Sequence, residues 1–451
     1  MMSAEQNDLM CRVGLGAPAG NLLRQYWQPV ALAEELGEPR ALRAVRLMGQ
    51  DYVLFRDQAG RLGMLDRACP HRGADLAYGR LEDGGLRCLF HGWLFDVKGR
   101  CLEMPAEPPG VRFCERVRQG AYPVQEKSGV IFAFVGTGAP PAFPAFDCFV
   151  APSAYTFAFK GLYECNWLQA LEVGIDPAHA SFLHRFFVDE DPREGYGRQF
   201  RGASSDTSLP MTRVMREFAR PEILVDAVAH GMRLTALRRI DEASTHVRVT
   251  NLVFPQAFVI PMNEDMTITQ WHVPVDDTHC YWVAIFTSFG EPVDKARMRE
   301  QRLATYTLPD YAPRLNRSNG YGFDVDEQLR DTYTGMGMDI NVHDQWAVEG
   351  QGAIQDRARE HLGTSDRAIV RYRRMLLDAI AKQRDGKSLP MRPDVAMAAT
   401  MRGPATMDGV AHGVAWNDYW IAADRARRES AQWDAGIDGG AVGAGAREAA
   451  A

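Results

Sequence analysis

Two short Cys/His motifs in the N-terminal third constrain the fold of this chain more than any other feature. The first places Cys69 two residues before His71, and the second places Cys88 three residues before His91, with sixteen residues between the motifs. Two such motifs can clamp one metal centre between them, so they are expected to lie on two adjacent loops. A glycine closely follows each motif, as tight loops of this kind require.

The mixture of ligands favours one kind of metal centre. Zinc sites more often pair cysteine with cysteine and histidine with histidine, whereas each motif here carries one of each. A [2Fe–2S] cluster with two thiolates on one iron and two imidazoles on the other matches this set. Such a cluster has a reduction potential between about −150 and +300 mV and can accept an electron from a flavin or ferredoxin. A Cys2His2 zinc site and a chance grouping of loop residues are the alternatives.

The residues around these ligands resemble the Rieske cluster motif, since the chain reads CPHRGA and then CLFHGWLFD. The resemblance implies a Rieske [2Fe–2S] cluster. It implies that Cys69 and Cys88 bind one iron, and that His71 and His91 bind the other.

A second group of candidate ligands lies in the segment Asp176-Pro-Ala-His179, followed by His184. An Asp-Pro pair is also typical of a helix start, so the histidines could be ordinary helix residues. On a straight helix a spacing of five places two side chains roughly 140° apart. A metal shared by both histidines therefore requires a bend or a helix end between Ala180 and His184.

An electron carrier alone does not need the long remainder of this chain, whereas a 2-His-1-carboxylate site on Fe(II) leaves positions open for O2. The spacing D-x-x-H-x4-H, preceded by Asn-Trp, resembles the mononuclear iron motif of Rieske non-haem iron oxygenases. The resemblance implies that His179 and His184 are iron ligands. It implies that Asp176 is a bridging carboxylate, which connects His179 with the partner subunit's His91.

The third iron ligand should be a carboxylate far along the chain. The candidates in the segment that follows Met338 are Asp339, Asp344, Glu349 and Asp356, and surface charge on a helix is the simple explanation for each. HDQWAVEGQG resembles the third-ligand helix of the family, which implies Asp344, with Glu349 in reserve.

The stretch QDRAREHLGTSDRAIVRYRRML resembles the phthalate dioxygenase branch, in which one type of large subunit assembles without a small partner chain. The resemblance extends over roughly residues 20–385. It implies an α+β fold, with an antiparallel β Rieske domain and a C-terminal antiparallel sheet covered by helices. We expect an N-terminal helical and irregular segment (1–40), the Rieske domain (41–155), the catalytic iron domain (156–430) and a disordered tail (431–451).

Composition excludes several other classes of protein. The 451 residues carry 51 Lys and Arg against 58 Asp and Glu, and the absence of a basic block argues against a nucleic-acid partner. No secretion signal is visible, and prolines interrupt the longest charge-free stretch, Ser128 to Phe146, so we expect no membrane helix. The eight cysteines are then best interpreted as thiols or metal ligands of a cytoplasmic protein.

The resemblance implies a terminal oxygenase that uses O2 to hydroxylate a small aromatic substrate, an aromatic carboxylate of the phthalate type. Electrons would come from NAD(P)H through a separate flavin and iron–sulfur reductase or a ferredoxin, and the subunits would form a homo-oligomer, a trimer or hexamer. Arg248 and Arg213 could bind a substrate carboxylate, although an arginine on a strand is more often solvated or paired. A monooxygenase or O/N-demethylase, a Rieske electron-transfer protein without oxygenase activity, and a zinc-stabilised binding module are the alternatives.

Overall fold

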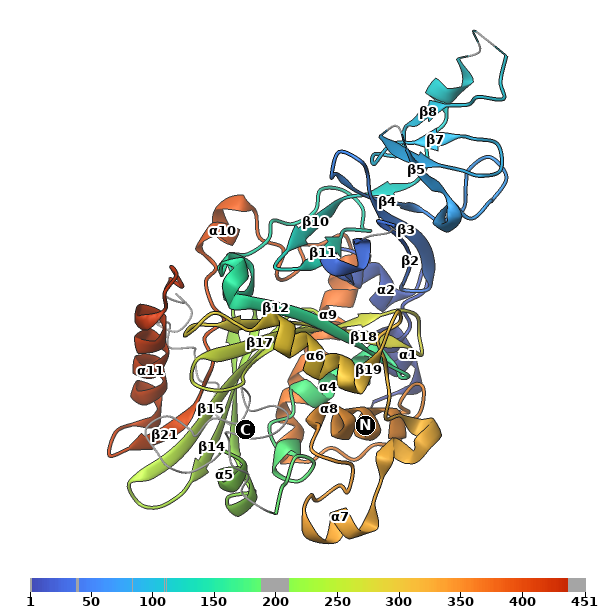
Figure 1. Cartoon of the computed structure of the whole chain (residues 1–451). Coiled ribbons are helices and arrows are strands. Elements are labelled where there is room, and N and C mark those ends of the chain that lie inside the picture. Colours follow the sequence, from blue (N-terminus) through green and yellow to red (C-terminus); the bar gives the residue numbers. More distant parts are fainter. Residues whose placement is uncertain are drawn as a thin grey trace.

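The computed structural model describes residues 2–37, 40–82, 84–108, 110, 112–187 and 211–436. A small β domain projects from a larger domain that is organised around one antiparallel sheet (Figure 1). This combination is the α+β class that the sequence predicts. No described helix is both long and apolar enough to cross a membrane. Of the expected disordered tail, the part from residue 437 onward lies outside the described residues.

Three short antiparallel sheets build the N-terminal β domain. In sheet order they contain β2 (Leu42–Leu47), β3 (Gln50–Arg56), β4 (Leu62–Asp66) and β9 (Ala121–Tyr122); β5 (Arg80–Glu82), β6 (Gly85–Arg87), β7 (Leu94–Phe95) and β8 (Cys101–Glu103); and β1 (Gln28–Leu32), β11 (Val130–Ala133) and β10 (Val124–Lys127). Between residues 40 and 66 the sequence has short alternating runs, a pattern that predicts strands, and β2, β3 and β4 form there. Strand β1 was expected to be irregular, but it is an edge strand, where Pro29 is tolerated.

The larger domain contains one sheet of eight strands. In sheet order they are β12 (Thr156–Tyr163), β18 (Cys280–Ser288), β17 (Met266–Pro274), β16 (Ala257–Pro261), β15 (Ser244–Val253), β14 (Gly231–Arg239) and β13 (Glu222–Val228), and β21 (Met407–His412) also pairs with β15. All neighbouring strands are antiparallel, as the family resemblance implies. Strand β21 brings the C-terminal region back to the middle of the sheet, and α11 (Trp416–Ser430) packs on it (Figure 1).

Two neighbouring helices, α4 (Trp167–Gly174) and α8 (Ile340–Gly350), position the candidate ligands of the second site. Helix α4 follows β12 directly and packs against both the sheet and α8. Asn166 caps α4, since its side chain accepts a hydrogen bond from the amide of Leu168 at 3.1 Å. The sequence predicts one helical stretch over 344–385, whereas the structure has α8 and α9 (Arg367–Arg384) with an irregular segment between them. Gly352 has a φ of +92°, a conformation that ends the helical path after α8.

Glu172 of α4 connects this helix with α9 and with the segment between α8 and α9 through buried ion pairs. Its carboxylate accepts hydrogen bonds from Arg357 at 2.9 Å and from Arg373 of α9 at 2.6 Å, and all three side chains are buried. Buried charges require such pairing, so Glu172 has a structural explanation although it lies near the candidate iron ligands in sequence.

Candidate functional site

The four candidate cluster ligands lie on two loops with the same backbone geometry. In each loop the glycine amide donates to the carbonyl of the cysteine, Gly73 to Cys69 at 2.8 Å and Gly92 to Cys88 at 3.1 Å. Both glycines have positive φ, +75° and +73°, which permits this tight turn. The two loops of the Cys/His pattern therefore close in the same way.

The side chains at the tip of these loops form a mixed thiol and imidazole cluster. Cys69 and Cys88 are both buried, and burial together with the neighbouring Cys88 thiol raises the pKa of Cys69 to about 11. The ring centroids of His71 and His91 lie 4.4 Å apart, and Trp93 stacks on His71 at the same distance. The Nδ1 atom of His91 is buried and has no hydrogen-bond partner among the described residues, as a nitrogen that binds metal would be.

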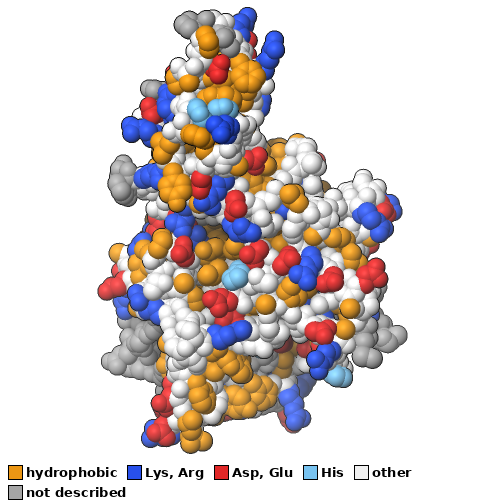
Figure 2. Space-filling view, turned by 90° about the vertical axis from the view of Figure 1, so that its right-hand side faces the viewer, with side chains coloured by type: hydrophobic (Ala, Val, Ile, Leu, Met, Phe, Trp, Pro, Cys, Tyr) orange, Lys and Arg blue, Asp and Glu red, His pale blue; other side chains and the backbone are white. Residues whose placement is uncertain are grey.

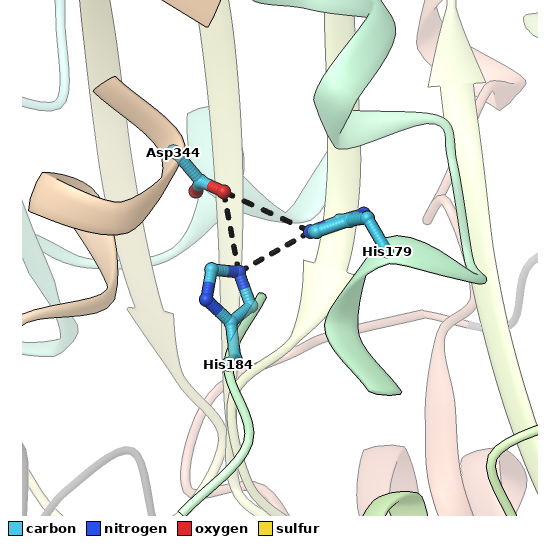
Figure 3. A group of neighbouring side chains, drawn as sticks. All are labelled: His179, His184 and Asp344. Carbon is cyan, nitrogen blue, oxygen red and sulfur yellow. Dashed lines mark hydrogen bonds and ion pairs between the residues drawn. The ribbon is translucent and has the colours of Figure 1, made fainter. Parts of the chain in front are cut away.

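The second site brings together residues that are far apart in the sequence. The Nε2 atoms of His179 and His184 lie 3.2 Å apart, and Asp344 Oδ1 lies 3.2 Å from His184 Nε2 and 3.8 Å from His179 Nε2 (Figure 3). Among the described residues, these are the one group of three or more His, Cys, Asp and Glu side chains whose geometry could hold a metal ion. Asp344 Oδ1 is buried and accepts no hydrogen bond from a described residue. Two imidazole nitrogens and one carboxylate oxygen thus point at a common position.

The backbone bends between His179 and His184, so the two side chains can approach each other despite the five-residue spacing. Helix α4 ends at Gly174, and His179 begins a single 3₁₀ turn, His179–Ser181, after which the chain turns again before His184. Asp344 approaches from the first half of α8. The required helix end between Ala180 and His184 is therefore present.

Electrostatics agree with a metal site. Burial lowers the pKa of His179, and the neighbouring His184 lowers it further, so the imidazole is held in its neutral form. Burial alone would raise the pKa of Asp344, but His184 and His179 lower it below its ordinary value. Neutral imidazoles and an ionised carboxylate are the forms in which these groups bind metals.

A cavity of about 170 Å³ opens beside the three ligands. Much of its lining is apolar, including Phe186, Phe258, Ile260, Met262 and Ile340. Its polar lining includes Arg248, Thr250, Gln270 and His272, and burial lowers the pKa of His272 to about 3, so this imidazole is neutral. An apolar cavity with a few polar groups is typical of a site for a small organic molecule.

Sequence and structure comparisons agree with this arrangement. Residues 26–123 match the Rieske [2Fe-2S] domain, and residues 141–421, more than half of the chain, match the LigXa C-terminal domain like family. The phthalate 4,5-dioxygenase oxygenase subunit of Pseudomonas putida is 35% identical over 437 residues, which cover 93% of this chain and 95% of that protein. The chain belongs to the Rieske non-haem iron oxygenases. Its cofactors are a Rieske [2Fe–2S] cluster and a mononuclear iron, and its co-substrate is O2.

Other relatives of this Rieske oxygenase catalyse different reactions. The 5,5'-dehydrodivanillate O-demethylase oxygenase subunit of Sphingobium sp. SYK-6 is 32% identical over 429 residues, 91% of this chain and 89% of that protein. The crystal structure of dicamba monooxygenase bound to dicamba matches with a TM-score of 0.55 at 21% identity, covering 81% of this chain and 99% of that one. At this identity, the structural match supports the fold alone.

The reserve ligand of this oxygenase, Glu349, lies outside the triad. Its carboxylate accepts hydrogen bonds from the amide of Glu164 at 2.9 Å, the hydroxyl of Tyr321 at 2.7 Å and the amide of Gln345 at 3.2 Å. Burial raises the pKa of Glu349. Its hydrogen-bonding capacity is used within the fold, so the geometry favours Asp344 over Glu349.

Asp176 lies next to the triad and lines the cavity. Its carboxylate accepts a hydrogen bond from the amide of Ala178 at 2.9 Å, and its backbone carbonyl accepts one from Nδ1 of His179. Because a carbonyl can only accept, Nδ1 of His179 carries the proton and Nε2 is left to bind metal. Asp176 therefore orients His179 through its backbone, a contact that the motif does not reveal.

The two candidate substrate arginines lie in different surroundings. Arg248 of β15 lines the cavity, pairs with Asp408 of β21 and donates to the carbonyl of Pro261 at 3.2 Å. Arg213 lies in a short helix, α5 (Met211–Glu217), rather than on a strand, and it forms an ion pair with Glu217 at 2.8 Å. Arg248 is among the residues that line the cavity, and Arg213 is not.

Sequence reasoning missed three residues of the site: His272, His343 and Asp408. His343 directly precedes Asp344, and its position next to a predicted ligand could have identified it as a candidate. His272 lies on a strand, where a single histidine is most often a core residue. Asp408 lies in β21, a strand that the sequence analysis did not predict.

Proposed function

We propose that this chain is the terminal oxygenase component of a system that hydroxylates an aromatic carboxylate of the phthalate type in the cytoplasm. The observation that carries the proposal is the presence of two unlike donor sets in one chain, one Cys/His set and one His/His/carboxylate set. The second set lies beside a cavity that carries one arginine among many apolar side chains. A monooxygenase or O-demethylase is the second candidate, and the O-demethylase relative supports it.

We propose that Cys69, Cys88, His71 and His91 hold the cluster, and that His179, His184 and Asp344 hold the mononuclear iron. When bound, the cluster supplies single electrons and the mononuclear iron activates O2. The protein holds the ligands in their metal-binding forms and places the second set, which is partly buried, beside the cavity. Two buried atoms that have no hydrogen-bond partner within the described part of the chain, Nδ1 of His91 and Oδ1 of Asp344, support this assignment.

We propose that the two centres meet between subunits of a trimer or hexamer, through Asp176 and the partner subunit's His91. Large apolar side chains are exposed on the loops beside the cluster ligands: Tyr78, Leu89 and Phe90. Others are exposed near the triad in sequence: Phe182, Tyr333 and Trp346. Figure 2 shows apolar side chains gathered around the histidines on the projecting domain. If one patch of a subunit covers the other patch of its neighbour, the subunits assemble head to tail, and such an interface can close into a ring.

Arg248 is the proposed anchor for a substrate carboxylate. Asp408 holds its guanidinium and also accepts a hydrogen bond from His246 at 2.9 Å. A carboxylate that reaches Arg248 would leave the apolar ring of the substrate in the cavity beside the triad. Arg213 remains a second proposal for the same role, with weaker geometric support.

A substrate screen tests the proposed function. The purified holoenzyme, with a generic NADH-dependent ferredoxin reductase, is given aromatic carboxylates and their neutral esters under ¹⁸O2, and labelled product is quantified. We expect labelled hydroxylated product from at least one carboxylate, and loss of preference over the ester in Arg248→Gln. A cis-diol with two labelled oxygens indicates a dioxygenase, and a phenol with an aldehyde indicates an O-demethylase. Electron flow to the cluster with no labelled product from any compound, and no mononuclear iron, would contradict an oxygenase role.

A further inference from the structure

His343 lies directly behind one of the proposed iron ligands and has no role in the proposed function so far. It precedes Asp344 in α8, and its side chain is completely buried. Its Nδ1 atom lies 3.4 Å from Nδ1 of His184. Figure 3 shows that this second ring nitrogen of His184 points away from the triad.

The geometry of the two rings is that of an in-plane hydrogen bond. The His184 and His343 rings are inclined by only 25°, and their centroids lie 5.7 Å apart. The distance between the centroids is about the Nδ1–Nδ1 distance plus the radius of each ring. The two nitrogens therefore lie on the line between the centroids, and the rings meet edge to edge and are not stacked face to face. Each Nδ1 therefore lies close to the plane of the other ring, where its proton or lone pair is located.

The direction of this hydrogen bond follows from the far side of His343. Its Nε2 atom lies 2.9 Å from the carbonyl oxygen of Gly337, which can only accept. In the neutral ring the proton is therefore on Nε2, and Nδ1 of His343 carries a lone pair. His184 must then donate its Nδ1–H, which leaves Nε2 of His184 unprotonated and directed at Asp344 and His179.

We propose that His343 is a positioning residue that fixes the tautomer and ring orientation of His184 for metal binding. This inference rests on the iron assignment of the proposed function. His179 and His184 would then be oriented by different means, because Nδ1 of His179 meets a backbone carbonyl while Nδ1 of His184 meets a side chain. Since α8 supplies both Asp344 and His343, one helix turn sets the third ligand and the orientation of the second.

Two substitutions separate the role of His343 as an acceptor from its role in packing. In His343→Asn, the side-chain oxygen can occupy the position of Nδ1 and accept from His184. In His343→Gln, the terminal amide can occupy the position of Nε2, so the hydrogen bond to Gly337 is kept and the acceptor is lost. His230→Gln is the matched control, because His230 is a buried histidine that bonds to Asn251 and does not line the cavity.

The measurement is the Fe(II) affinity of the mononuclear site in the holoprotein with its cluster intact, by competition with a chromophoric chelator. Loss of a partner of this kind lowers metal affinity by about 10–100-fold, which we expect for His343→Gln. We expect His343→Asn and His230→Gln to stay close to the unmodified protein. The cluster absorbance and the melting temperature should be the same in all variants.

Three results would overturn the inference. Unchanged affinity in His343→Gln would show that no acceptor is needed, and equal losses in the Asn and Gln variants would assign His343 to packing alone. An equal loss in His230→Gln would show a general effect of altered core packing. In these cases the unmodified protein still binds iron and His184→Ala does not, so the proposed function stands. If the unmodified protein binds no mononuclear iron, both the function and the inference are wrong.

Discussion

The two candidate metal sites differ in how the chain builds them. The Cys/His site lies within residues 69–91, on two loops of the projecting domain that have matching hydrogen bonds. The His/His/Asp site joins residue 344 to residues 179 and 184, and it lies beside a cavity between helix and sheet. A local site on one small domain suits the transfer of electrons between proteins, whereas partly buried ligands beside a cavity suit chemistry on a small molecule. Substitutions in one site should therefore spare the other.

The largest effect is expected from Cys88→Ala. Loss of one thiolate should remove the whole cluster, because all four ligands are needed to hold it. The Rieske-type EPR signal should disappear, reductase-driven turnover should stop, and iron should fall from about three atoms per chain to about one. Cys101→Ala is the control, because Cys101 is a buried cysteine outside the four proposed ligands. If Cys88→Ala also empties the mononuclear site, the two sites are not independent.

Asp344→Ala should give the opposite result. The cluster signal should remain while the mononuclear iron and the turnover are lost, because the remaining imidazoles provide only two ligands. Glu349→Gln is the matched control, since Glu349 is a buried carboxylate on the same helix that bonds to Glu164 and Tyr321. It should keep its iron and lower the melting temperature. Loss of iron in Glu349→Gln with retention in Asp344→Ala would reverse the ligand assignment.

Asp176→Ala tests the connection between the two sites. Both metal centres should stay loaded, since the hydrogen bond from His179 goes to the backbone carbonyl of Asp176. Turnover should fall by about 10–100-fold, because the carboxylate proposed to meet the partner subunit's His91 is lost, and losses of this size are typical for residues that support a metal site. Single-turnover oxidation of the reduced cluster, compared with product formation, measures this effect. Full-speed turnover in Asp176→Ala would rule out the bridging role.

The smallest effect concerns stability at acid pH. Burial alone would raise the pKa of Asp408, but His246 and Arg248 lower it to about 2. An unfolded aspartate has a pKa of about 3.9, so the stabilisation is complete above this pH and is lost as the pH falls towards 2. We expect the stability difference between the unmodified protein and Asp408→Asn to shrink by about 2 kcal/mol over this interval.

Chemical denaturation at several pH values measures this difference. The exposed carboxylate variant Asp326→Asn is the control and should follow the unmodified protein at every pH. A constant difference for Asp408→Asn between pH 4 and pH 2 would show that Asp408 is not held in its ionised form.

The contrast between the sites also explains what could be predicted from the sequence. The candidate cluster ligands are close in sequence, so their spacing alone predicts a shared centre. The family resemblance was needed to predict His179 and His184 as a pair of ligands. On a straight helix, side chains five residues apart cannot bind one metal, and the sequence alone does not show that a helix ends between them. Asp344 and Glu349 are both carboxylates on one helix, and only packing shows that Glu349 is occupied by hydrogen bonds within the fold.

The sequence predicted the strands that bury one face beside strands nearby in the chain. Strands β13, β14 and β15 mix apolar and polar residues, and each pairs with a strand that is its direct neighbour in the sequence. Strand β21 was missed, because it pairs with β15 from more than a hundred residues away and has a short, mixed sequence. That strand carries Asp408, so the partner of Arg248 could not have been found from the sequence.

Gly174, at the end of α4, has a consequence for the range of molecules that such an enzyme can accept. Gly174 and Phe258 both line the cavity, and a Cβ atom at position 174 would lie 2.0 Å from the Phe258 ring. Any larger residue at position 174 must therefore displace that ring. One methyl group at position 174, five residues before His179 in the sequence, would reshape the cavity by displacing Phe258 of β16, without replacing a metal ligand. The size of residue 174 should therefore change which molecules fit the cavity while the metal ligands stay the same.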